Sequence, residues 1–446
     1  MDIYTLNLTA LLALCGVLFL LQRQTQKSNA NAPTNSKTTR APSQWPFLSV
    51  YTLAMASDWL QGPYLYSLYH DEHHLPPALI STLFTTGFVA GGAAGSVIGA
   101  AADRHGRKAA CLVFCVAYAL SCALTTTGSV PLLFAGRVLG GLGTSLLFSV
   151  FESWMVTDFR VRGLAARGAD LGATFGLMSS LNSGVAIVSG VGSEWLVGWA
   201  GTRKAPFVAA GGLLAVAAGL IWSLWSENYG ETGGKEEAKS GGSGGSGGQK
   251  SETKLWAIVS NPKVISLGLA STIFEGSMYL FVFFWTPALR SVQSSSPQGL
   301  PYGVIFASFM ASTLASSLAF GMITGRGLVS YTTLLLGILA TSSLCFLLSA
   351  QPRSEQSTFW VFCLFEAAVG MYFPCMGYLK GKLIEDGVRA QVYGMLRVPL
   401  NVFVVVSLLF TGDGDAFGPV FSVCSGLLIA ACGALWAATA NQEAVP

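Results

Sequence analysis

A short polar stretch, residues 99–108, reads Gly-Ala-Ala-Ala-Asp-Arg-His-Gly-Arg-Lys and lies at the junction of two apolar segments, residues 77–101 and 109–127. Its small residues let helix ends approach one another, and its Asp and Arg side chains can pair and cap neighbouring helices. Basic residues concentrate in the cytoplasmic loops of membrane proteins. The stretch therefore predicts two membrane-spanning helices joined by a cytoplasmic loop.

The composition extends this prediction to the whole chain. Of 446 residues, 52% are hydrophobic and 11% are charged, whereas about 25% are charged in an ordinary soluble domain. The apolar residues gather in blocks of about 20 or more, the length that crosses hydrocarbon as a helix. The net charge of +3 gives no reason to expect a nucleic-acid partner. We expect an all-α polytopic membrane protein surrounded by a lipid bilayer.

One extra apolar segment precedes twelve core segments. No Lys or Arg precedes this block, residues 3–21, whereas Arg23 and Lys27 follow it, which reverses the charge order of a cleavable signal peptide. We interpret it as a retained span with an extracellular N-terminus. The core segments have the approximate limits 46–69, 77–101, 109–127, 130–155, 168–193, 205–226, 263–287, 302–324, 331–350, 357–379, 390–411 and 417–439.

The distribution of positive charge gives the orientation. The loops on the side of residues 99–108 carry most of the Lys and Arg residues, and the opposite loops carry few. This predicts a cytoplasmic C-terminus in the cell membrane. Arg203, Lys204 and Arg290 are exceptions.

A Gly/Ser/Lys/Glu-rich stretch, residues 227–254, separates the sixth and seventh core segments. Such a composition cannot build a core and predicts a flexible cytoplasmic linker. We therefore expect an N-terminal span and basic loop at 1–45, a six-helix bundle at 46–226, the linker, and a second six-helix bundle at 255–446. Two parallel repeats of this kind usually face each other across a central cavity.

Residues 99–108 match the GxxxDRxGR[RK] signature of the major facilitator superfamily at every defined position. The alternative is a basic stop-transfer cluster, which any cytoplasmic loop can contain. The location between the second and third of twelve core segments favours the signature and predicts a major facilitator fold. The expected cytoplasmic gating motif consists of Gly99, Asp103, Arg104, Gly106 and Arg107.

Charged residues inside the apolar segments are the first candidates for a functional site. A charge in the middle of a bilayer costs on the order of 2.5–3.5 kcal/mol, so its presence usually reflects a function or a buried partner. The candidates are Asp58, Arg137, Glu152, Glu275, Glu366 and Arg397.

Tyr393, Arg397 and Asn401 are spaced by four residues and form one polar stripe on an otherwise apolar segment. Arg presents several N–H donors in a fixed fork that suits oxyanions, and Tyr and Asn add neutral donors. We predict that this stripe binds substrate, with Arg137 as a second cation. The alternative is that Arg397 is structural and pairs with a buried carboxylate.

Four carboxylates are predicted to serve proton coupling or to line the cavity: Asp58, Glu275, Glu366 and Glu152. Buried carboxylates can carry protons. The alternative is that they neutralise Arg137 and Arg397, and Glu152 can also act as a cytoplasmic gate or cap. Lys380 lies at the membrane edge, where extension of its side chain to the interface explains it without a function.

Other chemistry has little support. The segment His70-Asp-Glu-His-His74 has metal-binding residue types, but it falls in a short exposed loop with no second cluster, which favours a solvated loop over a metal site. The cysteines make no CxxC pair. Neither an HExxH pattern nor a P-loop occurs, which argues against an enzyme. No metal and no cofactor are expected.

Several longer strings resemble a narrower group, the molybdate-anion transporter family of the major facilitator superfamily. These strings are Ser57-Asp-Trp-Leu-Gln-Gly-Pro-Tyr-Leu-Tyr66, Leu147-Phe-Ser-Val-Phe-Glu-Ser-Trp154, Phe283-Phe-Trp-Thr-Pro287, Gly370-Met-Tyr-Phe-Pro374 and Arg397-Val-Pro-Leu400. The resemblance covers the chain outside the linker and residues 22–45, and the extra N-terminal span fits it.

The resemblance implies uptake of molybdate, a tetrahedral dianion, by a secondary active transporter of the cell membrane. We expect a monomer that uses alternating access with possible proton coupling. Two alternatives stay open: a carrier of another anion such as sulfate, phosphate or an organic acid, and a non-transporting receptor or scaffold with the same fold.

Overall fold

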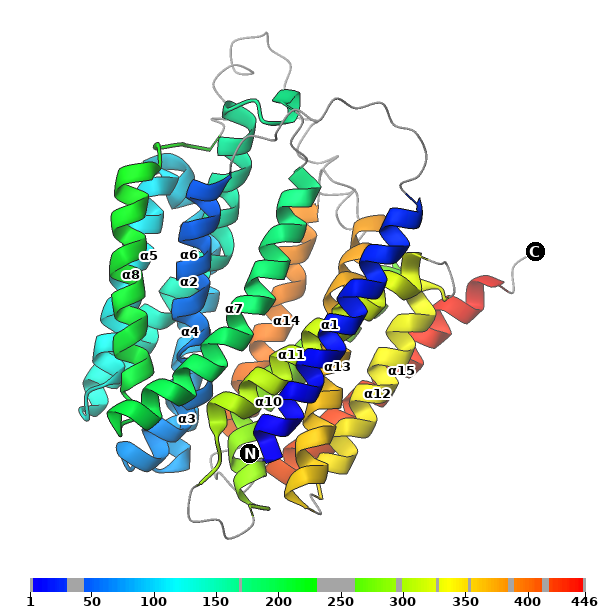
Figure 1. Ribbon diagram of the computed structural model, residues 1–446. Coiled ribbons are helices and arrows are strands. Elements are labelled where there is room, and N and C mark those ends of the chain that lie inside the picture. Colours follow the sequence, from blue (N-terminus) through cyan, green and yellow to red (C-terminus); the bar gives the residue numbers. More distant parts are fainter. Residues whose placement is uncertain are drawn as a thin grey trace, which may run out of the picture. The chain divides into compact units, whose positions relative to one another are not determined.

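In the computed structural model the described residues are 3–29, 44–167, 171–230, 261–293, 299–325, 329–351, 354–383, 389–410 and 417–443. Within these ranges all regular structure is helical (Figure 1). The first helices are α1 (Ile3–Asn29), α2 (Trp45–Trp59), η1 (Gly62–Tyr64), α3 (Leu65–Ser67), η2 (Leu68–Glu72), α4 (Pro77–His105), α5 (Arg107–Thr125), α6 (Val130–Val161), η3 (Ala165–Arg167), α7 (Leu171–Ala200) and α8 (Ala205–Leu224). The later helices are α10 (Pro262–Arg290), α11 (Tyr302–Gly325), α12 (Tyr331–Ser349), α13 (Glu355–Leu383), α14 (Arg389–Phe410) and α15 (Phe417–Glu443).

Eleven helices in the described ranges are long and apolar enough to cross a membrane, and they include α1. The prediction of one continuous helix over 46–69 is wrong. α2 ends at Trp59, and a 3-10 turn at Gly62–Tyr64 follows it. Pro63 has no N–H to donate and its ring obstructs a preceding helical turn, which explains the break. α14 has the predicted position, but its apolar part, Val398–Leu409, is short.

Two compact units divide the described residues. Unit 1 lies within Met1–Leu8, Gln24–Thr232 and Pro301–Met310, and unit 2 lies within Thr9–Arg23, Gly233–Leu300 and Ala311–Pro446. Most of the predicted linker, residues 231–254, lies outside the described residues.

Unit 1 is held together by close helix packing. α5 packs against α6 and α8, and α2 packs against α7 and α8 (Figure 1). α4 also packs on α6, where a Cβ atom on Gly141 would overlap the carbonyl oxygen of Gly87. A larger residue at Gly141 would therefore force the two helices apart. Ser145 donates a hydrogen bond to the Gly91 carbonyl across the same contact, at 2.7 Å.

The first turns of α11 also belong to unit 1 and pack on α7. A Cβ atom on Gly303 would overlap the Gly190 carbonyl oxygen, so the two backbones touch. One turn further along α7, Glu194 Oε2 accepts hydrogen bonds from the Tyr64 hydroxyl at 2.6 Å and from the Gly303 N–H at 2.8 Å. Negative charge is favourable at a helix N-terminus, where N–H groups lack intrahelical acceptors.

Unit 2 has an aromatic core. α10 packs against α13, α14 and α15, and α12 packs against α13 and α15. Phe365 contacts both Phe281 and Phe346, each with a centroid separation of 4.8 Å, and Phe346 contacts Phe421 at 5.3 Å. Aromatic side chains supply the largest buried areas, so this cluster contributes much of the packing energy.

The extra N-terminal helix contacts α11 within unit 2. The Cys15 thiol lies 3.2 Å from the Ala311 carbonyl oxygen, and the Gln22 amide lies 3.1 Å from the Cβ position of Gly321. Leu12, Val17 and Leu20 on other faces of α1 are exposed. Such a helix has one protein-facing stripe and an apolar remainder that suits lipid.

Arg203 and Lys204, which are exceptions to the charge rule, have local partners in unit 1. Arg203 pairs with Asp71 at 3.1 Å, and Lys204 Nζ lies 3.6 Å from Glu72. The Arg203 N–H also donates to Glu72 at 2.9 Å. Both basic residues of this loop therefore have acidic partners nearby, and the orientation stays a prediction.

Candidate functional site

A partly buried polar cluster joins α10 and α13 in unit 2. Glu275 lies roughly halfway along α10, and its Oε1 atom accepts hydrogen bonds from the Ser271 hydroxyl at 2.7 Å and the Tyr372 hydroxyl at 2.9 Å. Lys380 Nζ lies 3.8 Å from the same oxygen and donates to the Ser271 hydroxyl at 2.7 Å. The cluster thus brings a cation, a carboxylate and two hydroxyl groups together between apolar helices.

The position of Lys380 differs from the sequence-based interpretation. A lysine that extends to the membrane interface would expose its ammonium group. Instead the Lys380 side chain is 15% exposed, and its ammonium group reaches Ser271 on the neighbouring helix. Lys380 is therefore part of the polar cluster and not a surface anchor.

Unit 1 contains a second carboxylate–tyrosine contact. The Tyr118 hydroxyl on α5 donates to the Asp58 carboxylate near the end of α2. Gly143 on α6 makes room for this tyrosine, since a Cβ atom there would lie 2.5 Å from the Tyr118 ring. The sequence Gly140-Gly141-Leu142-Gly143 thus serves helix packing on two sides of α6.

Arg137 is held within unit 1 by groups other than carboxylates. Its Nε atom donates to the Leu83 carbonyl at 3.3 Å, and its guanidinium lies 5.1 Å from the Phe84 ring centroid. Gly87 leaves space for the guanidinium, because a Cβ atom there would lie 2.6 Å from it. Among the described side chains no carboxylate pairs with Arg137, which argues against its simple neutralisation by Asp58.

The other two predicted carboxylates have different surroundings. Glu366 on α13 is 6% exposed, and it accepts a hydrogen bond from the Thr313 hydroxyl on α11 at 3.1 Å. Glu152 on α6 is exposed. Glu366 is therefore sealed within unit 2, whereas Glu152 has an accessible side chain.

The predicted oxyanion stripe is described only in part. The side chains of Tyr393 and Arg397 lie outside the described part of the chain. Asn401 is half-buried on α14. Near it, Phe403 packs tightly on α10, since a Cβ atom on Gly276 would overlap the Phe403 ring. The role of the stripe stays a prediction.

The predicted gating motif forms the turn between α4 and α5. Arg107 binds Asp103 with two nitrogens, at 2.7 and 2.8 Å, and donates to the Ser153 carbonyl and the Thr157 hydroxyl on α6. Gly106 has a φ angle of +110°, which residues with a Cβ atom rarely adopt. Arg104 is exposed, and Gly99 has no atom within 4 Å of its Cβ position.

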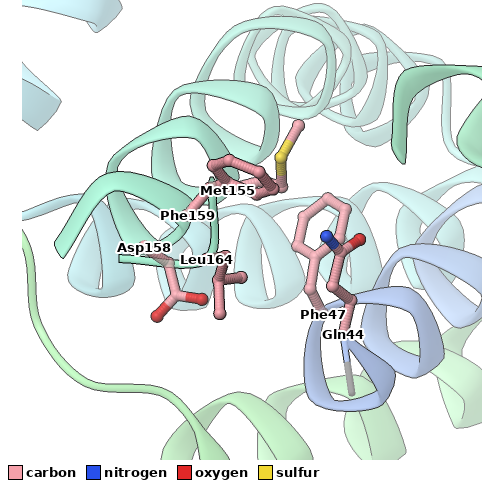
Figure 2. A pocket seen from close by; sticks show the side chains of 6 residues that line it. All are labelled: Gln44, Phe47, Met155, Asp158, Phe159 and Leu164. Carbon is pink, nitrogen blue, oxygen red and sulfur yellow. The ribbon is translucent and has the colours of Figure 1, made fainter. Parts of the chain in front are cut away.

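A small pocket at this end of unit 1 contains none of the predicted site residues (Figure 2). Figure 2 shows the side chains that line it: Gln44, Phe47, Met155, Asp158, Phe159 and Leu164. Asp158 pairs with Arg162 at 3.2 Å, and Gln44 donates to Thr174 at 2.8 Å. The first contact lies within the end of α6 and the second connects the start of α2 with α7, so we interpret the pocket as part of the helix packing.

Comparison with known proteins decides the family. A family model described as sugar transporters with twelve transmembrane segments matches residues 3–378. The molybdate-anion transporter of Xenopus laevis is 33% identical over 442 residues, which cover 96% of this chain and 92% of the relative. The protein of that name from Danio rerio is 30% identical and covers 94% of this chain and 92% of its own length.

The chain belongs to the molybdate-anion transporter family. This membership confirms the resemblance of the quoted strings and makes the chain a multi-pass membrane protein related to transporters. A crystal structure of a point mutant of the peptide transporter POT, in complex with alafosfalin, superposes with a TM-score of 0.69 at 13% identity, covering 93% of this chain and 98% of the other. This likeness confirms the major facilitator fold.

In this member of the molybdate-anion transporter family, sequence reasoning missed several residues of the polar clusters. Tyr118 and Tyr372 were not selected, although tyrosines in apolar segments often place a hydroxyl on a buried partner. Glu194 falls one residue beyond a predicted segment limit, and the run Ser193-Glu194-Trp195 within a long helix could have identified it.

Proposed function

We propose that this chain is a secondary active transporter that brings molybdate into the cell. Family membership supports this proposal, because the relatives with about one third of their residues identical are named molybdate-anion transporters. The observation that carries it is the Lys380 ammonium group held between two membrane-spanning helices beside the Ser271 and Tyr372 hydroxyls. Cations with neighbouring hydroxyl donors are suited to a tetrahedral dianion.

The charges also bear on the class of substrate. The description of the matching family model suggests a neutral sugar. Charges inside a membrane protein are costly, and a half-buried lysine and a half-buried arginine can pair directly with an anionic substrate but not with a neutral one. Lys380 and Arg137 therefore favour an anion over a sugar.

The proposed mechanism is alternating access by two six-helix bundles, residues 46–226 and 255–446, joined by the linker 227–254 and preceded by the region 1–45. Proton coupling through Asp58, Glu275, Glu366 or Glu152 is part of the proposal, as is substrate binding by Arg397, Asn401, Tyr393 and Arg137. We further propose a monomer in the cell membrane with a cytoplasmic C-terminus and an extracellular N-terminus.

The direct test is molybdate uptake in cells that lack their own high-affinity carrier, with surface expression measured in parallel. We expect uptake by the wild type that tungstate inhibits more strongly than sulfate, and that sugars do not inhibit. The Arg397→Ala variant at equal expression tests the predicted stripe. Uptake that survives this change would remove Arg397 from the site and leave the transporter proposal in place.

Two outcomes would contradict the cargo assignment. Stronger inhibition by sulfate, phosphate or an organic acid would indicate another anion. Absence of uptake despite good surface expression would favour a receptor or scaffold with the same fold. The paired helices with buried charges argue against a scaffold, which has no need of costly charges in the membrane.

A further inference from the structure

Two hydroxyl donors and one ammonium group surround a carboxylate oxygen in unit 2. The Ser271 and Tyr372 hydroxyls donate to Glu275 Oε1 at 2.7 and 2.9 Å, and Lys380 Nζ lies 3.8 Å from it. An oxygen atom of a tetrahedral oxyanion is an acceptor of the same kind as a carboxylate oxygen. The donor set therefore fits an oxyanion oxygen as well as it fits Glu275.

We propose that Lys380, Ser271 and Tyr372 form an oxyanion subsite that the Glu275 carboxylate occupies when no substrate is bound. A tetrahedral oxyanion binds there by displacing Glu275. This inference rests on the proposed function as an anion transporter, and it names the residues and the built-in competitor of the site.

The geometry of the pair argues against a purely structural salt bridge. A lysine–carboxylate hydrogen bond has an N–O distance of about 2.7–2.9 Å, whereas Lys380 and Glu275 are separated by 3.8 Å. The ammonium group donates to Ser271 instead, at 2.7 Å. Because a buried ion pair stabilises a protein only with excellent geometry, this loose arrangement is poorly explained by stability alone.

Packing fixes the Tyr372 donor, whereas the Lys380–Glu275 pair is partly exposed. The Tyr372 ring stacks on Phe274 with centroids 3.9 Å apart and an interplanar angle of 14°, which fixes the position of its hydroxyl. The side chains of Lys380 and Glu275 are partly exposed, at 15% and 20%. Glu366, at 6%, is sealed by comparison.

Glu275 also neutralises Lys380 in the empty site. Lys380 and Glu275 together are neutral without substrate, which limits the cost of holding a charge in the membrane. An oxyanion that takes the place of Glu275 keeps a negative group beside Lys380. Glu275 is thus a competitor that lowers the affinity for substrate, and its neutralisation should raise that affinity.

The test is equilibrium binding of molybdate to the purified full-length protein in detergent, with tungstate, sulfate and phosphate as further probes. Lys380→Met should raise the Kd for molybdate by roughly tenfold to a hundredfold, because a charge-assisted hydrogen bond is lost. Tyr372→Phe should raise it by about threefold to tenfold. Lys382→Met removes the same charge from an exposed position two residues away and should leave the Kd unchanged.

Glu275→Gln is the decisive variant, because it should lower the Kd by about threefold or more, and misfolding cannot produce tighter binding. Lys380→Arg should restore part of the affinity that Lys380→Met loses.

An unchanged Kd in Lys380→Met, or weaker binding in Glu275→Gln, would overturn the subsite. Binding of molybdate by the wild type would still leave the proposed function standing. If the wild type binds sulfate or phosphate but not molybdate, and the variants change the Kd for that anion in the directions given above, the subsite is supported and the cargo assignment fails. If no oxyanion binds to the wild type, both fail.

Discussion

Lys380 and Glu275 lie 3.8 Å apart and share the Ser271 hydroxyl, which accepts a hydrogen bond from the lysine and donates one to the carboxylate. Removing one member of such a pair leaves the other charge without its partner. Lys380→Met should therefore lower the free energy of unfolding by about 1–2 kcal/mol, a value reduced for the partial exposure of both groups.

The double variant Lys380→Met/Glu275→Gln should recover part of this loss, with a coupling energy of about 1 kcal/mol. Thermal unfolding of the purified proteins in one detergent measures all three variants. Strictly additive losses would show that the two side chains do not interact.

Asp58 and Tyr118 allow the charge of a carboxylate to be separated from its hydrogen bond. Asp58→Asn keeps an acceptor oxygen for the Tyr118 hydroxyl, so the unfolding temperature should stay close to that of the wild type. If the Asp58 carboxylate serves transport, the same variant should lose most of its molybdate uptake. Tyr118→Phe keeps the carboxylate but removes its hydrogen-bond donor. It should lower the free energy of unfolding by about 1–3 kcal/mol, because a hydrogen bond to a charged group is lost. Normal uptake by Asp58→Asn at equal expression would exclude the carboxylate from the transport mechanism.

Gly106 has a left-handed backbone conformation and little space for a side chain. Its φ angle is +110°, and an added Cβ atom would lie 2.6 Å from the Glu227 carboxyl carbon. Glu227 accepts hydrogen bonds from the Lys108 and Ala109 N–H groups, so it caps the start of α5. Gly106→Ala should lower the free energy of unfolding by about 1–3 kcal/mol.

Gly99→Ala is the matched control in the same motif, because its Cβ position has no neighbour within 4 Å. It should change stability by less than about 0.5 kcal/mol. The two variants are compared by thermal unfolding in detergent. Equal stability of both proteins would mean that the turn at Gly106 relaxes without cost.

Residues 99–108 predicted the fold because many positions of this short signature are defined. Together they identify the superfamily and locate a helix boundary. The end of α4 at His105 and the start of α5 at Arg107 agree with the predicted loop. The break after Trp59 was missed, although Gly62 and Pro63 were visible in the sequence, because high hydropathy on both sides concealed it.

The sites were less predictable because their contacts join distant parts of the chain. Lys380 meets Ser271 across 109 residues, and the direction of its side chain depends on helix packing that no local pattern encodes. Asp58 and Glu275 were selected as charged residues inside apolar segments, but this criterion could not identify Tyr118 and Tyr372 as their partners. Arg397 was selected by the same reasoning, and its role stays a prediction.

Glu194 gives a prediction that can be checked at a single backbone amide. Its carboxylate accepts hydrogen bonds from the Tyr64 hydroxyl at 2.6 Å and from the Gly303 N–H at 2.8 Å. Gly303 lies in the first turn of α11, where N–H groups have no intrahelical acceptor. Glu194→Ala should therefore lower the stability by about 1–3 kcal/mol and speed hydrogen exchange at the Gly303 amide.

Glu194→Gln keeps an acceptor oxygen and should have a smaller effect on both measurements. Glu72→Ala is the control, because Glu72 contacts Thr202, Arg203 and Lys204 and should leave the Gly303 amide unchanged. Hydrogen exchange followed by mass spectrometry of peptides from the start of α11 makes the comparison. An amide that loses its hydrogen-bond acceptor exchanges faster. Equal protection of the Gly303 amide in Glu194→Ala and in the wild type would therefore show that the Glu194 carboxylate does not hold this helix N-terminus.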